Sequence, residues 1–278
     1  MKIFVAGATG VVGSRMIPAL VQAGHEVVGT TRRAERAAAV EEQKAAAVVL
    51  DVLDADATRA AVAEAAPDVV IHQLTDLADR DFAANSRLRI DGTRNLVDAA
   101  KAAGVQRMIA QSIAWLYEPG TEPAVETDPL DPAPQPYEGI AALEAAVAEM
   151  PRGIVLRYGA LYGPGTWYEP GGFFAEQVRE GEQKLEPVWT SFIHVDDAAA
   201  AAVAALDWPA GTVNVVDDEP ALAQDWLPVY AAALGAPAPR QAGRHAAGKG
   251  RPVSNAKARD LGWKPSVPSW REGFAALG

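Results

Sequence analysis

Three glycines near the start of the chain have the spacing of a phosphate-binding loop. Gly7, Gly10 and Gly13 lie in the segment GATGVVG, between an apolar run at residues 2–6 and an amphipathic stretch. Glycines placed between a strand and a helix allow a tight turn and bring backbone N–H groups close to a diphosphate, while the helix N-terminus favours the negative charge. No GK[ST] follows, so the segment predicts a dinucleotide site whose residues are Gly7, Thr9, Gly10, Val11, Val12 and Gly13.

The end of the second expected strand bears on which dinucleotide binds. It reads Thr30-Thr31-Arg32-Arg33, without the acidic residue that binds the ribose 2′-hydroxyl of NAD. A guanidinium suits a 2′-phosphate, because its planar fork of donors matches phosphate oxygens. We therefore predict NADP(H) rather than NAD(H) as cofactor, with Arg32 and Arg33 at the phosphate. The alternative is that both arginines are solvated residues at the start of a helix.

The elements that must position this loop follow from hydrophobic patterning. Short β-branched runs at 2–6, 25–31, 46–50, 68–74, 106–112 and 152–158 alternate with helical patterns near 13–23, 34–43, 58–65, 83–103 and 139–149. Strands separated by helices of this length imply βαβ crossovers and a parallel sheet covered on both faces. The predicted fold class is α/β, a Rossmann-type doubly wound parallel sheet with a smaller C-terminal substrate lobe.

The composition of the sequence changes after residue 158. A loop at 161–172 is rich in glycine, proline and aromatic residues, and further elements are expected at 173–179, 188–195, 198–206, 212–216, 222–234, 256–261 and 270–277. We assign residues 1–158 to a dinucleotide-binding Rossmann core. Residues 159–278 are assigned mostly to a substrate-binding lobe, with segments around 190–216 returning to the core.

Composition excludes several classes of protein. The 278 residues carry 25 basic and 36 acidic side chains, a net charge of −11, which disfavours binding to nucleic acid or to anionic lipid. There is no cysteine, and the longest wholly apolar run, at 198–206, is about half the length of a membrane-spanning helix. We expect a cytoplasmic protein with a small-molecule substrate and no membrane partner. The histidines lack metal-ligand spacing, so no metal site is expected.

Together these motifs resemble the extended or atypical short-chain dehydrogenase/reductase superfamily, in its NAD-dependent epimerase/dehydratase group. The resemblance covers nearly the whole chain. Its other markers are Asp51-Val52, IHQL from Ile71, DGTRNLVDAA from Asp91, Tyr137 with Glu144, LRYGALYGPGT from Leu156 and SFIHVDDAA from Ser191. The resemblance implies that Asp51 and Val52 flank the adenine, that Leu74 lies at the middle of the dinucleotide, and that Tyr158 lies on the nicotinamide side.

The catalytic set of the family is only partly present. The family uses Tyr-x-x-x-Lys with a Ser or Thr, but Tyr137 is followed four residues later by Ala141, and Ile113 stands where the hydroxyl residue is expected. Ser112, one place away, either substitutes for that hydroxyl or satisfies a strand end. Without a nearby cation a tyrosinate base is disfavoured, whereas the neutral Tyr137 hydroxyl can still donate a proton as a hydride arrives. Tyr137 and Ser112 are the predicted catalytic residues.

Departures from the family also bear on the substrate. Members that act on nucleotide sugars have an asparagine and an arginine where this chain has Ala160 and Thr190. The loss of both disfavours a nucleotide-sugar substrate. Aromatic rings remain near the expected pocket and suit a flat or apolar ligand; those predicted to bind substrate are Trp115, Tyr162, Trp167, Tyr168 and Trp189.

These features predict an NADP(H)-dependent oxidoreductase that reduces a ketone or enone of a hydrophobic small molecule. Two alternatives stay open. One is a non-redox cyclase, isomerase or dehydratase that retains the dinucleotide, and the other is a non-enzymatic dinucleotide sensor. The missing lysine favours both alternatives, whereas the ring-rich loop disfavours the sensor.

The resemblance also implies a homodimer built on the helices near 83–103 and 139–149. The second helix carries Ile140, Leu143, Val147 and Met150 at three- and four-residue spacing. This apolar stripe either contacts a partner subunit or faces the sheet of its own chain.

Overall fold

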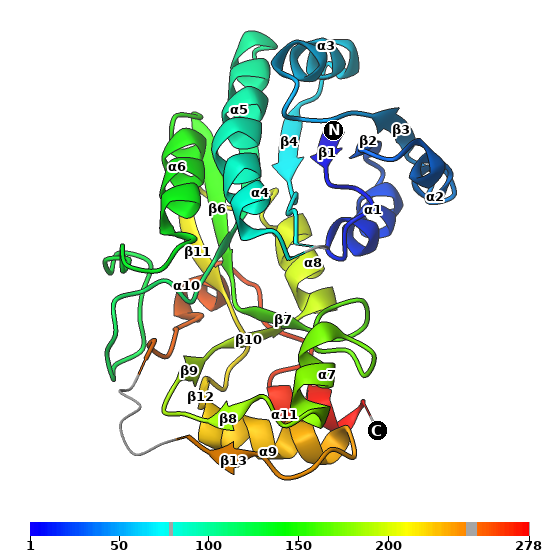
Figure 1. Cartoon of the computed structure of the whole chain (residues 1–278). Coiled ribbons are helices and arrows are strands. Elements are labelled where there is room, and N and C mark those ends of the chain that lie inside the picture. The colour runs from blue at the N-terminus through cyan, green and yellow to red at the C-terminus, as the bar shows by residue number, and fades with distance from the viewer. Residues whose placement is uncertain (78–79, 243–248, 278) are drawn as a thin grey trace. The chain divides into compact units, whose positions relative to one another are not determined.

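The computed structural model describes residues 1–77, 80–242 and 249–277 (Figure 1). The chain forms two compact units. The first comprises residues 1–112, 133–156 and 199–212, and the second comprises 113–132, 157–198 and 213–278. The units interleave along the chain. The sequence predicted a division after residue 158 with segments around 190–216 returning to the core, and residues 199–212 belong to the first unit.

The central sheet has seven strands in the order β11-β6-β5-β4-β1-β2-β3. β1 lies between β2 and β4 and pairs in parallel with both, with Val5 opposite Gly29 and Ile71. The sheet, with helices around it, confirms the predicted α/β, Rossmann-type fold class. The bounds of its strands are β1 (Lys2–Ala6), β2 (Glu26–Thr31), β3 (Ala46–Val49), β4 (Val69–His72), β5 (Arg107–Ile113), β6 (Arg152–Tyr158) and β11 (Gly211–Val215).

The period-two pattern of the strands divides their side chains between the two faces of the sheet. Phe4, Val70 and Met108 face a core that is completed by α3, α5 and α6, and α3 lies beside α5 in Figure 1. The helical segments of the first unit are α1 (Gly13–Gln22), η1 (Ala34–Arg36), α2 (Ala37–Glu41), α3 (Ala55–Ala65), α4 (Phe82–Arg87), η2 (Leu88–Gly92), α5 (Thr93–Ala102) and α6 (Tyr137–Ala148).

The single helix predicted at 83–103 is divided by a π-helical turn. α4 begins after Asp81, whose side chain accepts a hydrogen bond from the N–H of Ala84 at 2.9 Å. η2 then inserts a wider turn before α5. Turns of this kind occur often at functional sites, and this one buries both Leu88 and Arg89.

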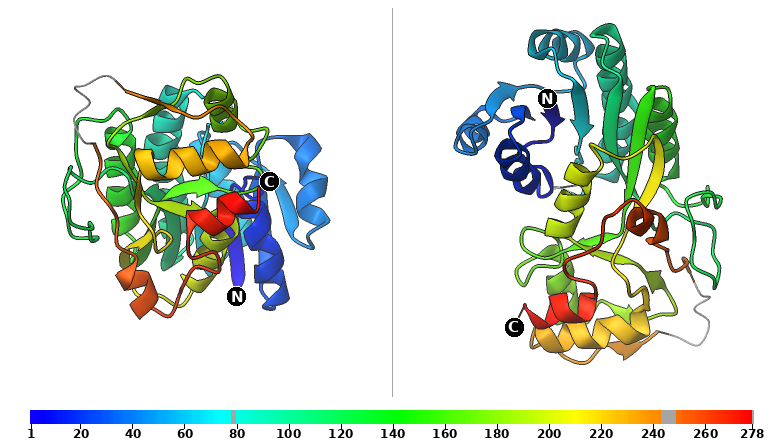
Figure 2. Two further views of the ribbon diagram at one scale, coloured as in Figure 1. Left: turned by 90° about the horizontal axis from the view of Figure 1, so that it is seen from below. Right: turned by 180° about the vertical axis from the view of Figure 1, so that it is seen from behind.

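The second unit has its own core of aromatic and aliphatic side chains around Phe192, Tyr230 and Phe274. Helices α9 and α11 lie side by side in both views of Figure 2. One helix, α8 (Val195–Ala204), begins in the second unit and continues in the first. The other elements of the second unit are β7 (Ala160–Tyr162), α7 (Phe173–Arg179), β8 (Lys184–Leu185), β9 (Trp189–Thr190), β10 (Phe192–His194), β12 (Ala221–Leu222), α9 (Ala223–Ala233), β13 (Arg240–Gln241), α10 (Ala256–Asp260) and α11 (Trp270–Ala275).

Candidate active site

The glycine loop between β1 and α1 has no room for side chains at two of its glycines. Gly7 has a φ of +97°, and a Cβ there would lie 2.9 Å from the carbonyl carbon of Gln73. A Cβ on Gly13 would lie 2.1 Å from the carbonyl oxygen of Gly7. Because both contacts are with backbone, larger residues would distort the loop.

The start of α1 fits the diphosphate of a dinucleotide. No side chain caps its N-terminus, and no acidic residue stands in its first turn. The first N–H groups of the helix therefore face no competing carboxylate within the helix, and its dipole favours an anion. A nicotinamide dinucleotide bound here would supply a hydride. Of the other predicted loop residues, Thr9 is half-buried beside Thr31, Val11 accepts a hydrogen bond from Arg15 through its carbonyl, and Val12 is buried.

The arginines after β2 have different surroundings. Arg32 binds Asp76 through two hydrogen bonds of 2.9 and 3.0 Å, while Arg33 is exposed. A third arginine, Arg36, lines a hollow of about 160 Å³ beside Thr9 and Ser14. The sequence analysis did not single out Arg36, because this residue lies in η1, beyond the end of the strand. Extending the search four residues past Arg32 would have included it.

Two of the three residues implied to contact the middle and adenine end of the dinucleotide are accessible. Asp51 is exposed and accepts the N–H of Leu53 at 3.0 Å. Leu74 is half-buried, and its N–H donates to Nδ1 of His72 at 3.2 Å. Val52 instead belongs to the hydrophobic core and is 2% exposed.

The two predicted catalytic residues both lie in the first unit. Tyr137 is the first residue of α6 and is half-buried. Ser112, near the end of β5, is 2% exposed, and its hydroxyl donates to Oε1 of Glu144 at 2.6 Å. Ala141 stands one turn after Tyr137 and carries no charge. Ser112 is thus hydrogen-bonded to Glu144, which lies on α6 two turns beyond Tyr137.

The predicted aromatic set lies in the second unit and is divided between core and surface. Tyr162 is completely buried, and Tyr168 stacks on Phe174 with ring centroids 4.6 Å apart, so both rings are part of the core instead of a pocket wall. Tyr158, predicted on the nicotinamide side, is 2% exposed, with its hydroxyl donating to the carbonyl of Ala198. Trp167 is half-buried against Phe173.

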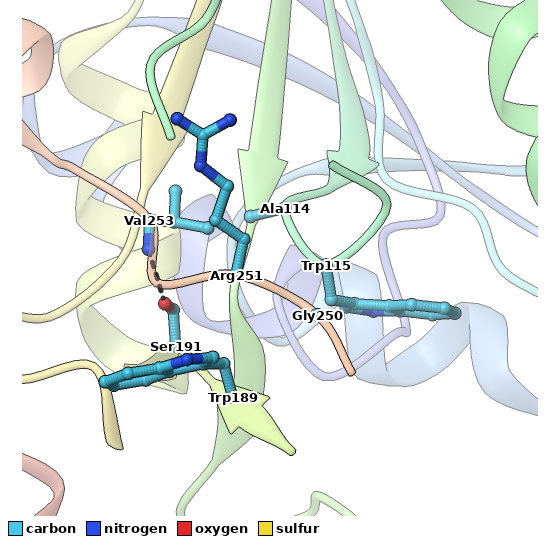
Figure 3. Close-up of a pocket in the computed structure, with 7 residues that line it drawn as sticks. All are labelled: Ala114, Trp115, Trp189, Ser191, Gly250, Arg251 and Val253. Carbon is cyan, nitrogen blue, oxygen red and sulfur yellow. Dashed lines mark hydrogen bonds between the residues drawn. The ribbon is translucent and has the colours of Figure 1, made fainter. Parts of the chain in front are cut away.

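Trp115 and Trp189 line a small hollow of about 10 Å³, together with Ala114, Ser191, Gly250, Arg251 and Val253 (Figure 3). Trp115 is 51% exposed, which is unusual for so large an apolar side chain. Figure 3 shows the two indoles on different sides of the hollow and the guanidinium of Arg251 pointing away from both. That guanidinium is held by Asp128 at 3.0 Å and by the carbonyl of Glu122 at 2.6 Å.

The second unit also buries a carboxyl group that sequence reasoning did not single out. Asp217 is 2% exposed; its Oδ1 accepts the N–H of Glu219, while Oδ2 has no hydrogen-bond partner among the residues described. Burial raises the pKa of Asp217 to about 8.

Helix α8 begins at Val195, three residues before the element expected at 198–206, so Asp196 and Asp197 lie in its first turn. Asp197 accepts hydrogen bonds from Ser266 and Val267. The rings of His194 and Tyr162 meet edge to face, with centroids 5.2 Å apart.

In the described ranges, no group of three or more His, Cys, Asp or Glu residues is arranged to hold a metal ion. No helix among them is long and apolar enough to cross a membrane.

Comparisons with known proteins agree with this architecture. The family model described as the NAD dependent epimerase/dehydratase family matches residues 3–216. A Streptomyces protein named 3-diazoavenalumate denitrifying reductase is 44% identical, over 99% of both chains. Among solved structures, UDP-glucose 4-epimerase of Thermus thermophilus in complex with NAD has a TM-score of 0.78 and 26% identity, over 99% of this chain and 97% of that one. WbmG of Bordetella bronchiseptica, in complex with NAD and UDP, has a TM-score of 0.81 and 24% identity, over 99% and 92%.

Proposed function

The chain belongs to the NAD-dependent epimerase/dehydratase family, and we propose that it is an NADP(H)-dependent reductase that replaces the diazo group of an aromatic substrate with hydrogen and releases dinitrogen. The coarser statement, an oxidoreductase-type enzyme, follows from the family and from the reductase among its relatives. The observation that carries the finer proposal is a complete dinucleotide loop in the same unit as an incomplete proton-transfer set.

Carbonyl reduction needs a proton for the oxygen that becomes an alkoxide. In this chain the cation is missing at Ala141, and Ser112 already donates its proton to Glu144. A positive charge about 4 Å from the phenol is worth about 4 kcal/mol at an effective dielectric constant near 20, so its loss weakens any step that ionises Tyr137. An acceptor that needs no proton fits this site better.

Reductive removal of a diazonium group is such a reaction. Its overall balance is Ar–N₂⁺ + NAD(P)H → Ar–H + N₂ + NAD(P)⁺. The hydride brings both electrons and the hydrogen that replaces nitrogen, so no net proton is consumed. The chain must then bind and orient the two reactants, and it needs no tyrosine–lysine pair.

The relatives and the aromatic residues support the substrate class. The Streptomyces relative, which matches this chain over nearly its whole length, has a name that gives a diazo carboxylate as substrate and a reduction with loss of nitrogen. In this chain the indole of Trp115 is 51% exposed and offers an accessible face on which a planar ring can stack. The reductase relative weighs against the non-redox and sensor alternatives.

A ketone or enone is the second acceptor, because Tyr137 stands half-buried at the start of α6, where it could donate a proton. For the cofactor, we propose NADP(H) with its 2′-phosphate at Arg36 and Arg33. The hollow beside Thr9 and Ser14 supports this placement, and it modifies the sequence-based assignment to Arg32 and Arg33.

An acceptor panel tests the function. Purified protein is mixed with NADPH or NADH and with arenediazonium salts of aromatic acids, ketones or enones. Cofactor absorbance, dinitrogen and the reduced arene are measured against enzyme-free reactions and against Gly13→Ala. We expect stoichiometric dinitrogen and arene with the diazonium acids. Turnover confined to ketones or enones would contradict the proposal.

A further inference from the structure

Arg89 is a buried cation without a counterion among the residues that the structure describes. Its side chain lies in the π-helical turn η2 and is 5% exposed. It makes no hydrogen bond and no ion pair with any residue that the structure describes, whereas its neighbours Arg87 and Arg94 are paired with Asp91 and with Asp98 and Glu149. An unpaired charge in the interior is costly, and buried charges are normally paired.

The described residues around Arg89 supply no anion. It lies close enough to His72 to contribute, after burial itself, to lowering the pKa of that histidine to about 4. His72 accepts the N–H of Leu74 at Nδ1, so its Nε2 carries the hydrogen and donates to Thr93 Oγ1 at 3.0 Å. His72 is therefore neutral and cannot balance the guanidinium. Burial also lowers the pKa of Arg89, to about 10, which leaves it charged at neutral pH.

The position of Arg89 along α6 follows from two contacts. Near the start of α6, a Cβ on Gly139 would lie 2.9 Å from Ser86 Oγ; just past its end, Glu149 binds Arg94 at 2.6 Å. From the first contact to the second, the residue number increases along both segments, from 86 to 94 and from 139 to 149. The segment that contains η2 therefore runs parallel to α6. Interpolation places Arg89 within about one helical turn of Ala141, beside the part of α6 that follows Tyr137.

We propose that Arg89 binds an anionic oxygen of a ligand, and that this oxygen is the carboxylate of the aromatic acid reduced by the enzyme. The identity of the ligand rests on the proposed function. The phosphates of a dinucleotide are the other source of such an oxygen, because His72 ends β4 opposite the end of β1, and the glycine loop follows β1. The position of Arg89 beside the part of α6 that follows Tyr137 favours the acid.

The test is calorimetry with 4-hydroxycinnamate and its methyl ester on protein saturated with NADP⁺, together with a separate titration of NADP⁺. The variants are Arg89→Met and Arg89→Gln, with Arg87→Met as the control on a solvent-exposed arginine of α4. We expect the wild type and the control to bind the acid more tightly than the ester, and both Arg89 variants to lose at least tenfold in affinity for the acid alone. If the Arg89 variants lose affinity for NADP⁺ alone, Arg89 binds an anionic oxygen of the dinucleotide and not the carboxylate of the acid.

Unchanged affinities of the Arg89 variants for both ligands, or equal affinities of the wild type for acid and ester, would overturn the proposal. Arg89→Met should also melt at or above the wild-type temperature, because it removes an unpaired buried charge. A marked fall in melting temperature with unchanged binding would assign Arg89 a purely structural role. Acid binding does not require turnover, so these outcomes are distinct from a failure of the diazo reaction.

Discussion

The hydroxyl of Ser112 donates a 2.6 Å hydrogen bond to the carboxylate of Glu144, joining the end of β5 to α6. A hydroxyl held in this way has already committed its proton, so it is a poor donor to a substrate. The bond connects the strand and the helix that carry the predicted catalytic residues.

Ser112→Ala is therefore expected to affect stability more than turnover. The substitution leaves Glu144 without this donor and should lower the free energy of unfolding by about 1–3 kcal/mol, while kcat with the diazonium acid stays within about threefold. Chemical denaturation and steady-state rates measure the two effects. A loss of turnover without a loss of stability would instead make Ser112 a catalytic donor.

Tyr137→Phe separates the two acceptor classes. Hydride replacement of a diazo group consumes no net proton, so the variant should retain turnover within a few-fold. With a ketone the same change should lower turnover by ~10²–10⁴, the range typical of a lost general acid. Turnover of both acceptors is measured on one preparation of the variant. A large loss of turnover with the diazonium acid would show that Tyr137 supplies a proton in that reaction too.

Arg36→Ala should weaken NADPH binding about tenfold or more, since a charge-assisted hydrogen bond is worth about 1.5–3 kcal/mol. NADH binding should not change, because NADH has no 2′-phosphate. Calorimetry with both dinucleotides makes the comparison. Arg32→Ala is the matched control, because the Arg32 guanidinium already binds Asp76. A larger loss of NADPH affinity in Arg32→Ala than in Arg36→Ala would instead show that the 2′-phosphate binds at Arg32, after the end of β2.

Asp217 should make stability depend on pH. Its folded-state pKa of about 8 lies above the ordinary carboxyl value, because burial disfavours the charge. The folded state thus binds the proton more tightly, and the associated stability is present below about pH 4 and is lost as pH rises towards 8. Asp217→Asn should flatten this fall and exceed the wild type by about 2–4 kcal/mol at pH 9. A difference in the free energy of unfolding between wild type and Asp217→Asn that is the same at pH 6 and at pH 9 would contradict the assignment.

Much of the fold could be predicted from local sequence. The glycine segment requires a turn that only glycine fits at Gly7 and Gly13, and short apolar runs such as the one that contains Phe4 and Val5 predict the strands of a parallel sheet. The stripe of Ile140, Leu143, Val147 and Met150 has a helical period, but periodicity alone could not say which surface it meets. The structure buries all four in the chain itself, so the predicted homodimer must use other residues.

The site was less predictable, because it depends on contacts between distant segments. Tyr162 and Tyr168 have the composition of a binding surface, yet packing against Phe192 and Phe174 places them in the core. The burial of Arg89 depends on a π-helical turn, for which the sequence has no simple signal. The pairing of Ser112 with Glu144 joins residues 32 positions apart, a distance at which spacing rules no longer apply.

Isotope transfer tests the central claim most directly. NADPH carrying deuterium at nicotinamide C4, prepared separately with each stereochemistry, is incubated with the enzyme and an arenediazonium acid in ordinary water, and the arene is analysed by mass spectrometry and NMR. The account predicts that one of the two labelled cofactors places one deuterium per dinitrogen released at the carbon that carried the diazo group. An arene free of deuterium with both cofactors, or cofactor oxidation without release of dinitrogen, would contradict it.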